Sequence, residues 1–214
     1  MRKRQFVPLA IVAVMLALWV GSPRVRADAP ATTQAATTQM GVKFVGMGPP
    51  VATTIVFICD ASDAVTPSFD PLRKELRKAV EGLKSPQKCN VVFAHENAKP
   101  PLETSALEAT DENKKREYEY IDSYKPGGAA DIQSALKTAF AMKPNLIFLV
   151  CDPKGLSDPE GTFKLCQTYV ADHKCKINTV AFREHDEQGE NALKKISEDS
   201  GGHFKYVSDE EMKK

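Results

Sequence analysis

Two short apolar segments constrain the fold more than any other feature of the sequence. Residues 53–59 read T-T-I-V-F-I-C, and residues 145–151 read N-L-I-F-L-V-C. Neither segment alternates apolar with polar side chains, which is typical of strands buried on both faces of a sheet. Each segment ends directly before an aspartate, Asp60 or Asp152. The sequence therefore predicts a sheet covered on both sides, with a carboxylate at the end of two of its strands.

Further helices and strands alternate along the rest of the chain. Segments with apolar residues at helical spacing predict helices over residues 71–83, 131–142, 158–172 and 189–200. Short apolar segments predict additional strands over residues 89–94, 176–182 and 203–207. Residues 95–111 contain two prolines and are expected to form an irregular connection. This order implies right-handed crossovers and an α/β fold: a Rossmann-like, doubly wound, mostly parallel central sheet with helices on both faces.

The first 42 residues differ from the rest of the chain. Residues 1–4 are cationic, and residues 6–21 form an apolar run without a charge, which is the layout of an export signal. We expect a signal peptide over 1–27, with an uncleaved N-terminal membrane anchor as the alternative. Residues 28–42 are rich in Ala, Thr and Gln and are expected to be a flexible linker to a domain over 43–214. Both alternatives predict an extracytoplasmic domain, either secreted, periplasmic or anchored to the membrane by the N-terminus.

The charge balance and the motifs argue against several classes of function. Lys and Arg number 29, and Asp and Glu number 28, so the chain offers no overall attraction to nucleic acid or anionic lipid. The sequence after Asp60 contains no glycine-rich phosphate loop, and no histidine pairs with a serine or cysteine nucleophile in a recognisable motif. We therefore expect no nucleotide cofactor and no nucleic-acid partner.

Five cysteines are compatible with an oxidising compartment, but an odd number cannot pair completely within one chain. Cys59 and Cys151 end the two apolar segments, so we expect them to be small buried residues in strands. The pairing of the other cysteines stays open.

Four segments carry a resemblance to a known family. Residues 60–64 read D-A-S-D-A, residues 126–131 read P-G-G-A-A-D, residues 152–155 read D-P-K-G, and residues 200–207 read S-G-G-H-F-K-Y-V. In order and placement they are similar to the metal-binding loops and the closing strand of the von Willebrand factor type A (vWA) family. The resemblance runs from about Lys43 to the C-terminus. It implies a vWA-like fold and a non-catalytic module that binds a protein partner.

The resemblance also implies a divalent-cation site, but with ligands missing. Asp60, Ser62 and Asp152 match three of the family's ligand positions. Ala64 and Ala130 stand where the family pattern has a serine and a threonine, which removes two hydroxyl ligands. We expect a degenerate site that holds no metal or only weakly bound Mg²⁺. As an alternative, backbone N–H groups of the loops hold the two carboxylates without any metal.

Three hypotheses of function follow. The first is a non-catalytic, extracytoplasmic protein-binding module, for adhesion, interaction or scaffolding, with little or no metal dependence. The second is a metal-dependent vWA adhesion module in which Asp60, Ser62 and Asp152 hold a divalent cation. The third is an Asp-dependent hydrolase, which is disfavoured because haloacid dehalogenase enzymes need a second acid where Ser62 stands. The tyrosine-rich residues 111–124 form either a partner-facing surface or a solvated helix face whose tyrosines pack on the sheet. A membrane contact is expected only through the N-terminus.

Overall fold

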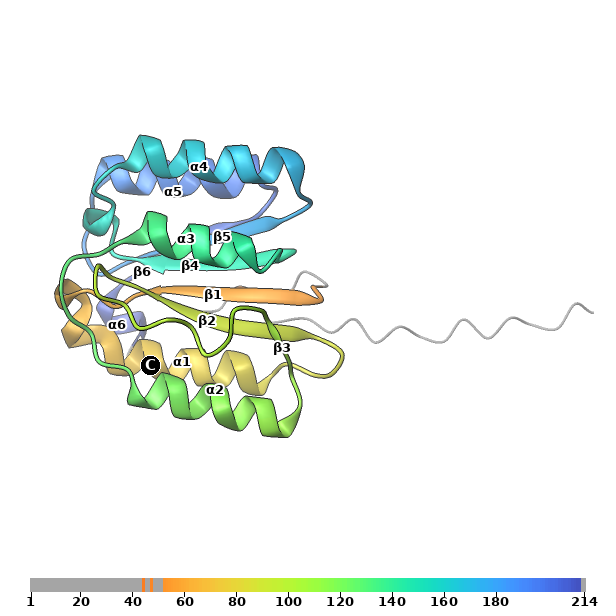
Figure 1. The fold of residues 1–214 in the computed structure, drawn as a ribbon. Helices are drawn as coiled ribbons and strands as arrows, with labels where there is room; N and C mark the ends of the chain where they lie inside the picture. Colours follow the sequence, from red (N-terminus) through yellow and green to blue (C-terminus); the bar gives the residue numbers. More distant parts are fainter. Residues whose placement is uncertain (1–43, 45–46, 48–51, 213–214) are drawn as a thin grey trace, which may run out of the picture. The chain divides into compact units, whose positions relative to one another are not determined.

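Six strands form one sheet in the order β3-β2-β1-β4-β5-β6 (Figure 1). All neighbouring strands are parallel except β2 and β3, which are antiparallel. The order reverses between β1 and β4, so the predicted doubly wound α/β sheet is confirmed. The strands are β1 (Thr54–Asp60), β2 (Lys88–Ala94), β3 (Leu107–Glu108), β4 (Leu146–Cys151), β5 (Lys176–Phe182) and β6 (Phe204–Val207).

The computed structural model describes residues 44, 47 and 52–212 of the 214-residue chain. The signal peptide or anchor predicted over 1–27 and the linker predicted over 28–42 lie outside the described residues. Within the described part, no helix combines the length and the apolar character needed to cross a bilayer.

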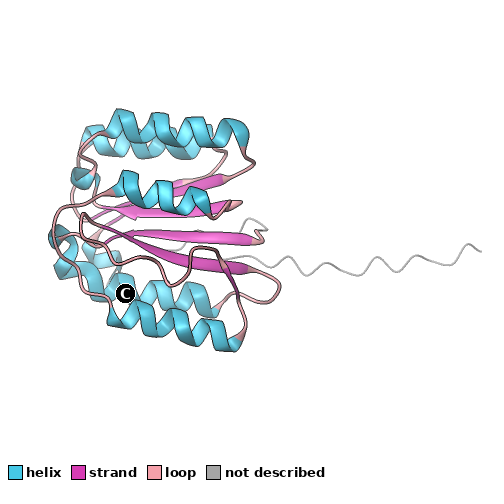
Figure 2. Cartoon of the chain, viewed as in Figure 1, coloured by secondary structure: helices cyan, strands magenta, loops and turns pink. Residues whose placement is uncertain are grey.

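Helices cover both faces of the sheet (Figure 2). The α-helices of the described residues are α1 (Phe69–Glu81), α2 (Asp111–Ser123), α3 (Ile132–Ala141), α4 (Pro159–Asp172), α5 (Glu187–Asp199) and α6 (Asp209–Met212). Two 3₁₀ helices, η1 (Asp63–Ser68) and η2 (Pro153–Gly155), follow β1 and β4 closely. The α1–α2 pair lies on one face, and α3, α4 and α5 lie on the other (Figure 1).

The strand β1 shows why both faces are covered. Ile55 and Phe57 pack with α1 and α2, whereas Val56 and Ile58 pack with α3, α4 and α5. All four side chains are fully buried, as the continuous apolar sequence predicts, because successive side chains of a strand point to opposite faces. All five cysteines are free and buried, including Cys59 and Cys151 at strand positions.

Aspartates begin the three helices that cover the second face. Asp131 accepts a hydrogen bond from the Ser134 amide at 3.0 Å at the start of α3. The side chains of Asp158 and Asp186 act in the same way at the starts of α4 and α5. Such caps satisfy amides that have no partner within the helix. Asp131 therefore serves as a helix cap.

For the eight helices and strands predicted after β1, the predicted bounds differ from the observed ones by at most two residues. The segment predicted as irregular, 95–111, contains the short edge strand β3. Residues 111–123 form α2, and its tyrosines Tyr118 and Tyr120 pack partly buried against the core. The solvated helix with tyrosines on the sheet is therefore the arrangement observed.

One acidic residue of α2 is fully enclosed. Glu117 is 1% exposed, and among the described residues neither of its carboxyl oxygens has a hydrogen-bond partner. Burial raises the pKa of Glu117 to about 8, against a small opposing effect of Arg116. The side chain is therefore a neutral acid near pH 7.

Candidate functional site

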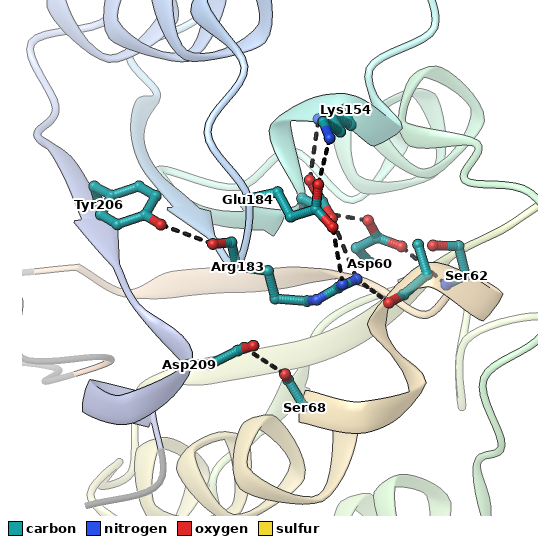
Figure 3. Close-up of polar contacts among 10 residues, drawn as sticks. Asp60, Ser62, Ser68, Lys154, Arg183, Glu184, Tyr206 and Asp209 are labelled. Carbon is teal, nitrogen blue, oxygen red and sulfur yellow. Dashed lines mark hydrogen bonds and ion pairs between the residues drawn. The ribbon is translucent and has the colours of Figure 1, made fainter.

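The carboxyl ends of β1 and β4 bring the predicted site residues together where the strand order reverses (Figure 3). Asp60 is the last residue of β1, and Asp152 directly follows β4, the neighbouring strand. The Asp152 amide donates to Asp60 Oδ2 at 3.2 Å, and the Ser62 amide donates to Asp60 Oδ1 at 2.9 Å. The sequence therefore placed Asp60, Ser62 and Asp152 correctly at one edge of the sheet.

Asp60 is sealed beneath two neighbouring loops. Its exposed fraction is 0%, and each carboxylate oxygen accepts one backbone N–H. A Cβ atom added at Gly155 would lie 3.1 Å from Asp60 Oδ2 and 3.1 Å from Ala130 Cβ, so the backbone at Gly155 lies close to both side chains. Burial raises the pKa of Asp60, and the two backbone hydrogen bonds oppose this rise. Asp60 thus ties the loop after β1 to the loop after β4.

One carboxylate oxygen of Asp152 accepts a backbone amide, and the other faces the guanidinium of Arg183. Its Oδ1 accepts the Lys154 amide at 3.1 Å and thereby caps η2. Its Oδ2 lies 3.4 Å from Nη1 of Arg183. Burial raises the pKa of Asp152, while the Lys154 amide and the Arg183 guanidinium act in the opposite direction.

Arg183, which the sequence analysis missed, links the loops of the site. It directly follows β5, and its Nη1 also donates to the Ala64 carbonyl. Its Nη2 lies 3.4 Å from Glu184 Oε1. The Arg183 side chain is only 15% exposed. The available sequence signal was its place at the carboxyl end of β5, the strand next to β4.

The glycine turn before α3 is fastened to the loop after β1. Gly128 has φ +72°, in the left-handed region that glycine adopts without steric cost. Its carbonyl accepts the Asp63 amide at 2.9 Å, and the Gly127 amide donates to the Ala61 carbonyl at 2.8 Å. Ala130, two residues after Gly128, presents a methyl group where the family pattern has a threonine.

These loops enclose a pocket of about 460 Å³ at the carboxyl edge of the sheet. Its wall includes Ser62, the glycine turn, Asp152 and Arg183, and an ion pair between Lys154 and Glu184 lies at the same place. The Ser62 hydroxyl is buried, and no described group forms a hydrogen bond of ordinary geometry with it. Asp60 is not part of the wall, because it lies beneath it.

The residues present do not fit the divalent cation that the family resemblance implies. Mg²⁺ prefers about six oxygen ligands in octahedral geometry. Asp60 is fully buried beneath the pocket wall, and Asp152 turns one oxygen toward the Arg183 guanidinium, whose positive charge would repel a divalent cation. Ala64 and Ala130 offer no side-chain oxygen, which leaves the Ser62 hydroxyl as the uncommitted ligand among the predicted set. Backbone N–H groups of the loops donate to both carboxylates.

This geometry defines a class of protein: a doubly wound α/β domain whose site lies between β1 and β4, where the strand order reverses. The profile of the family described as "von Willebrand factor type A domain" matches residues 53–206. The chain therefore belongs to the vWA family.

Solved structures share this fold at low sequence identity. A structure described as von Willebrand factor type A from Catenulispora acidiphila has a TM-score of 0.64 and 15% identity, over 75% of this chain and 39% of that one. Proximal thread matrix protein 1 from the mussel byssus has a TM-score of 0.56 and 16% identity, over 75% of this chain and 42% of that one. The chain thus spans less than half the length of either structure. No curated protein matches the sequence.

Proposed function

We propose that the chain is a non-catalytic, extracytoplasmic protein-binding module that engages its partner at the carboxyl-edge pocket with little or no dependence on a metal. Domains of the vWA family are typically protein-interaction modules. The observation that carries the proposal is the contact between Arg183 and Asp152, because it places a cation of the chain's own beside the pocket's buried carboxylate.

The burial of Asp60 favours a binding function over hydrolysis. An aspartate nucleophile must reach its substrate, whereas Asp60 is fully buried with an amide on each oxygen. In addition, Ser62 stands where a second acid would be needed, and its side chain carries no charge. An Asp-dependent hydrolase is therefore the least supported of the three hypotheses.

A metal-dependent adhesion module is the second candidate, and the buried Ser62 hydroxyl favours it. This hydroxyl lines the pocket, and no described group forms a hydrogen bond of ordinary geometry with it. Its oxygen would therefore be available to a cation. The other expected ligands favour the metal-independent function, because Asp60 is buried beneath the pocket wall and Asp152 faces the Arg183 guanidinium.

Site-specific photo-crosslinking in the cells that produce the protein tests the proposal. In one variant a photoreactive residue replaces Ala129, which is exposed and lines the pocket. In the control variant it replaces Lys84, which is exposed and lies between α1 and β2 at the opposite edge of the sheet. We expect a defined protein adduct from position 129 that persists in EDTA and is absent from position 84.

The three other outcomes are distinct. An adduct at position 129 that EDTA abolishes supports the metal-dependent module instead. Adducts at both positions, or none at position 129, contradict binding through the carboxyl-edge pocket. The extracytoplasmic part is tested separately by N-terminal sequencing and fractionation, since cytoplasmic protein with an intact, unanchored N-terminus would refute it.

A further inference from the structure

We propose that Arg183 is a tethered cation, which neutralises Asp152 and joins the loops of the site in place of a divalent metal ion. This inference rests on one part of the proposed function, its independence of a metal. It adds the residue that makes a metal unnecessary and the physical reason. Arg183 is here a positioning residue for the pocket.

The contacts of the guanidinium are those that a cation at this edge would make. It meets the Asp152 carboxylate, with Nη1 3.4 Å from Oδ2, and donates from the same nitrogen to the Ala64 carbonyl. These oxygens belong to the loops after β4 and β1, while Arg183 itself belongs to the loop after β5. One side chain thus joins three loops by oxygen contacts (Figure 3).

One guanidinium faces the carboxylate that lines the pocket. Asp60 is removed from the pocket wall by burial and two amide hydrogen bonds. Glu184 contributes one oxygen to Lys154 and the other to Arg183, so the Lys154 ammonium offsets its charge at the rim. Asp152 is then the one buried carboxylate in the described pocket wall, and the Arg183 guanidinium is the cation that faces it. A divalent ion beside Arg183 would meet like-charge repulsion at short range.

The backbone holds Arg183 in an uncommon conformation that aims it at the site. Its φ is +71°, in the left-handed region that side chains larger than glycine's rarely adopt. The Tyr206 hydroxyl of β6 donates to the Arg183 carbonyl at 2.7 Å, and the Tyr206 ring stacks on His185 with centroids 4.0 Å apart. Such a conformation persists where the surroundings hold it, as these contacts do.

Thermal unfolding of the full chain with and without Mn²⁺ tests the tethered cation. The variants are Arg183→Gln, the same change combined with Ala64→Ser and Ala130→Thr, and Arg77→Gln as a matched control. Arg77 forms its ion pair with Asp122 on the exposed surface of α1 and α2, away from the pocket. The assay contains no partner, so failure to bind a partner would bear on the proposed function alone.

We expect Mn²⁺ to leave the midpoint temperature of the wild type and of Arg77→Gln unchanged. Arg183→Gln should unfold roughly 5 °C lower, because Asp152 loses its buried counter-charge. Mn²⁺ should restore about 3 °C or more of this loss, most strongly in the variant with both hydroxyls restored. The paramagnetic ion gives a second measurement: in the wild type it should not selectively broaden the amide NMR signals of Ser62 and Asp152.

Two results would overturn the proposal. The first is selective broadening or Mn²⁺ stabilisation in the wild type that Asp152→Ala abolishes, which would refute metal independence as well. The second is a wild type without a metal response together with Arg183 variants that Mn²⁺ neither stabilises nor enables to fold. That second result would refute the role of Arg183 while leaving metal-independent partner binding intact.

Discussion

Buried carboxyl groups occur in two regions of the described structure, and their surroundings differ. At the carboxyl edge, Asp60 and Asp152 receive backbone amides on three oxygens and face Arg183 with the fourth. On the α2 face, Glu117 is equally buried but neither oxygen has a described hydrogen-bond partner. Burial raises the pKa of all three groups, and only at the edge do several donors oppose the rise.

The difference in hydrogen-bond donors distinguishes two roles of a buried acid. An acid surrounded by donors can carry a negative charge, which suits a site that orients loops around a pocket. An acid without donors stays protonated and acts as a polar group inside a helix–sheet interface. Four carboxyl groups test this distinction, because each region also has a more exposed acid: Asp131 at the edge and Asp122 on α2.

The largest expected effect is the pH dependence of stability caused by Glu117. Its pKa is about 8 in the folded protein and near 4.5 otherwise, so the folded state binds the extra proton. The stabilisation is complete below about pH 4.5 and is lost as the pH rises through about 8. Between these limits the wild type should lose roughly 3–5 kcal/mol relative to Glu117→Gln, which has no proton to release. Urea unfolding of both proteins from pH 4 to pH 9 measures the difference.

Parallel pH profiles for the wild type and Glu117→Gln would contradict this prediction. They would mean that Glu117 ionises in the folded protein with a partner, as the edge carboxylates do. The contrast between the two regions would then disappear.

The next effect comes from Asp60 itself. Replacing it with Ala leaves the amides of Ser62 and Asp152 buried without their acceptor. We expect a loss of about 3 kcal/mol in the free energy of unfolding, measured in urea at pH 7. Asp60→Asn is the matched variant, and it should lose less, because its carbonyl still accepts one amide. A loss below about 1 kcal/mol for Asp60→Ala would show that these hydrogen bonds do not hold the loops together.

The sequence predicted the edge better than the α2 face, for a physical reason. Parallel strands end at the same edge, so two apolar segments that each precede an aspartate must bring Asp60 and Asp152 close. Nothing comparable marks Glu117, which lies among charged residues in a helix of low apolar content. Its burial could have been inferred from Ile121, which follows four positions later on the same helix face and is fully buried.

Arg183 and β3 escaped prediction because their placement depends on tertiary structure. The guanidinium reaches Asp152 only after β5 lies beside β4 and the backbone of Arg183 adopts a left-handed conformation. The strand β3 has two residues, too few for any periodic pattern, and exists by pairing with β2. Local spacing contains neither kind of information.

Asp131 tests whether a hydrogen-bonded carboxylate at this edge stabilises the fold strongly even when it is not fully buried. It is half-buried and caps α3 through the Ser134 amide at 3.0 Å. Asp131→Ala should cost about 1 kcal/mol in the free energy of unfolding, and Asp131→Ser, which keeps an acceptor, should cost less. A loss as large as that of Asp60→Ala would indicate that Asp131 belongs to the site and is more than a cap.

The smallest effect is expected at Asp122, the exposed acid of α2. Its side chain is 50% exposed and pairs with Arg77, itself 39% exposed, so water and salt screen the interaction. Asp122→Asn should change the free energy of unfolding, measured in urea at pH 7, by less than about 0.5 kcal/mol. A larger change would mean that charge on α2 matters whether or not it is buried. In that case the pH dependence assigned to Glu117 would have to be measured again in the Asp122→Asn background, since the two acids share one helix.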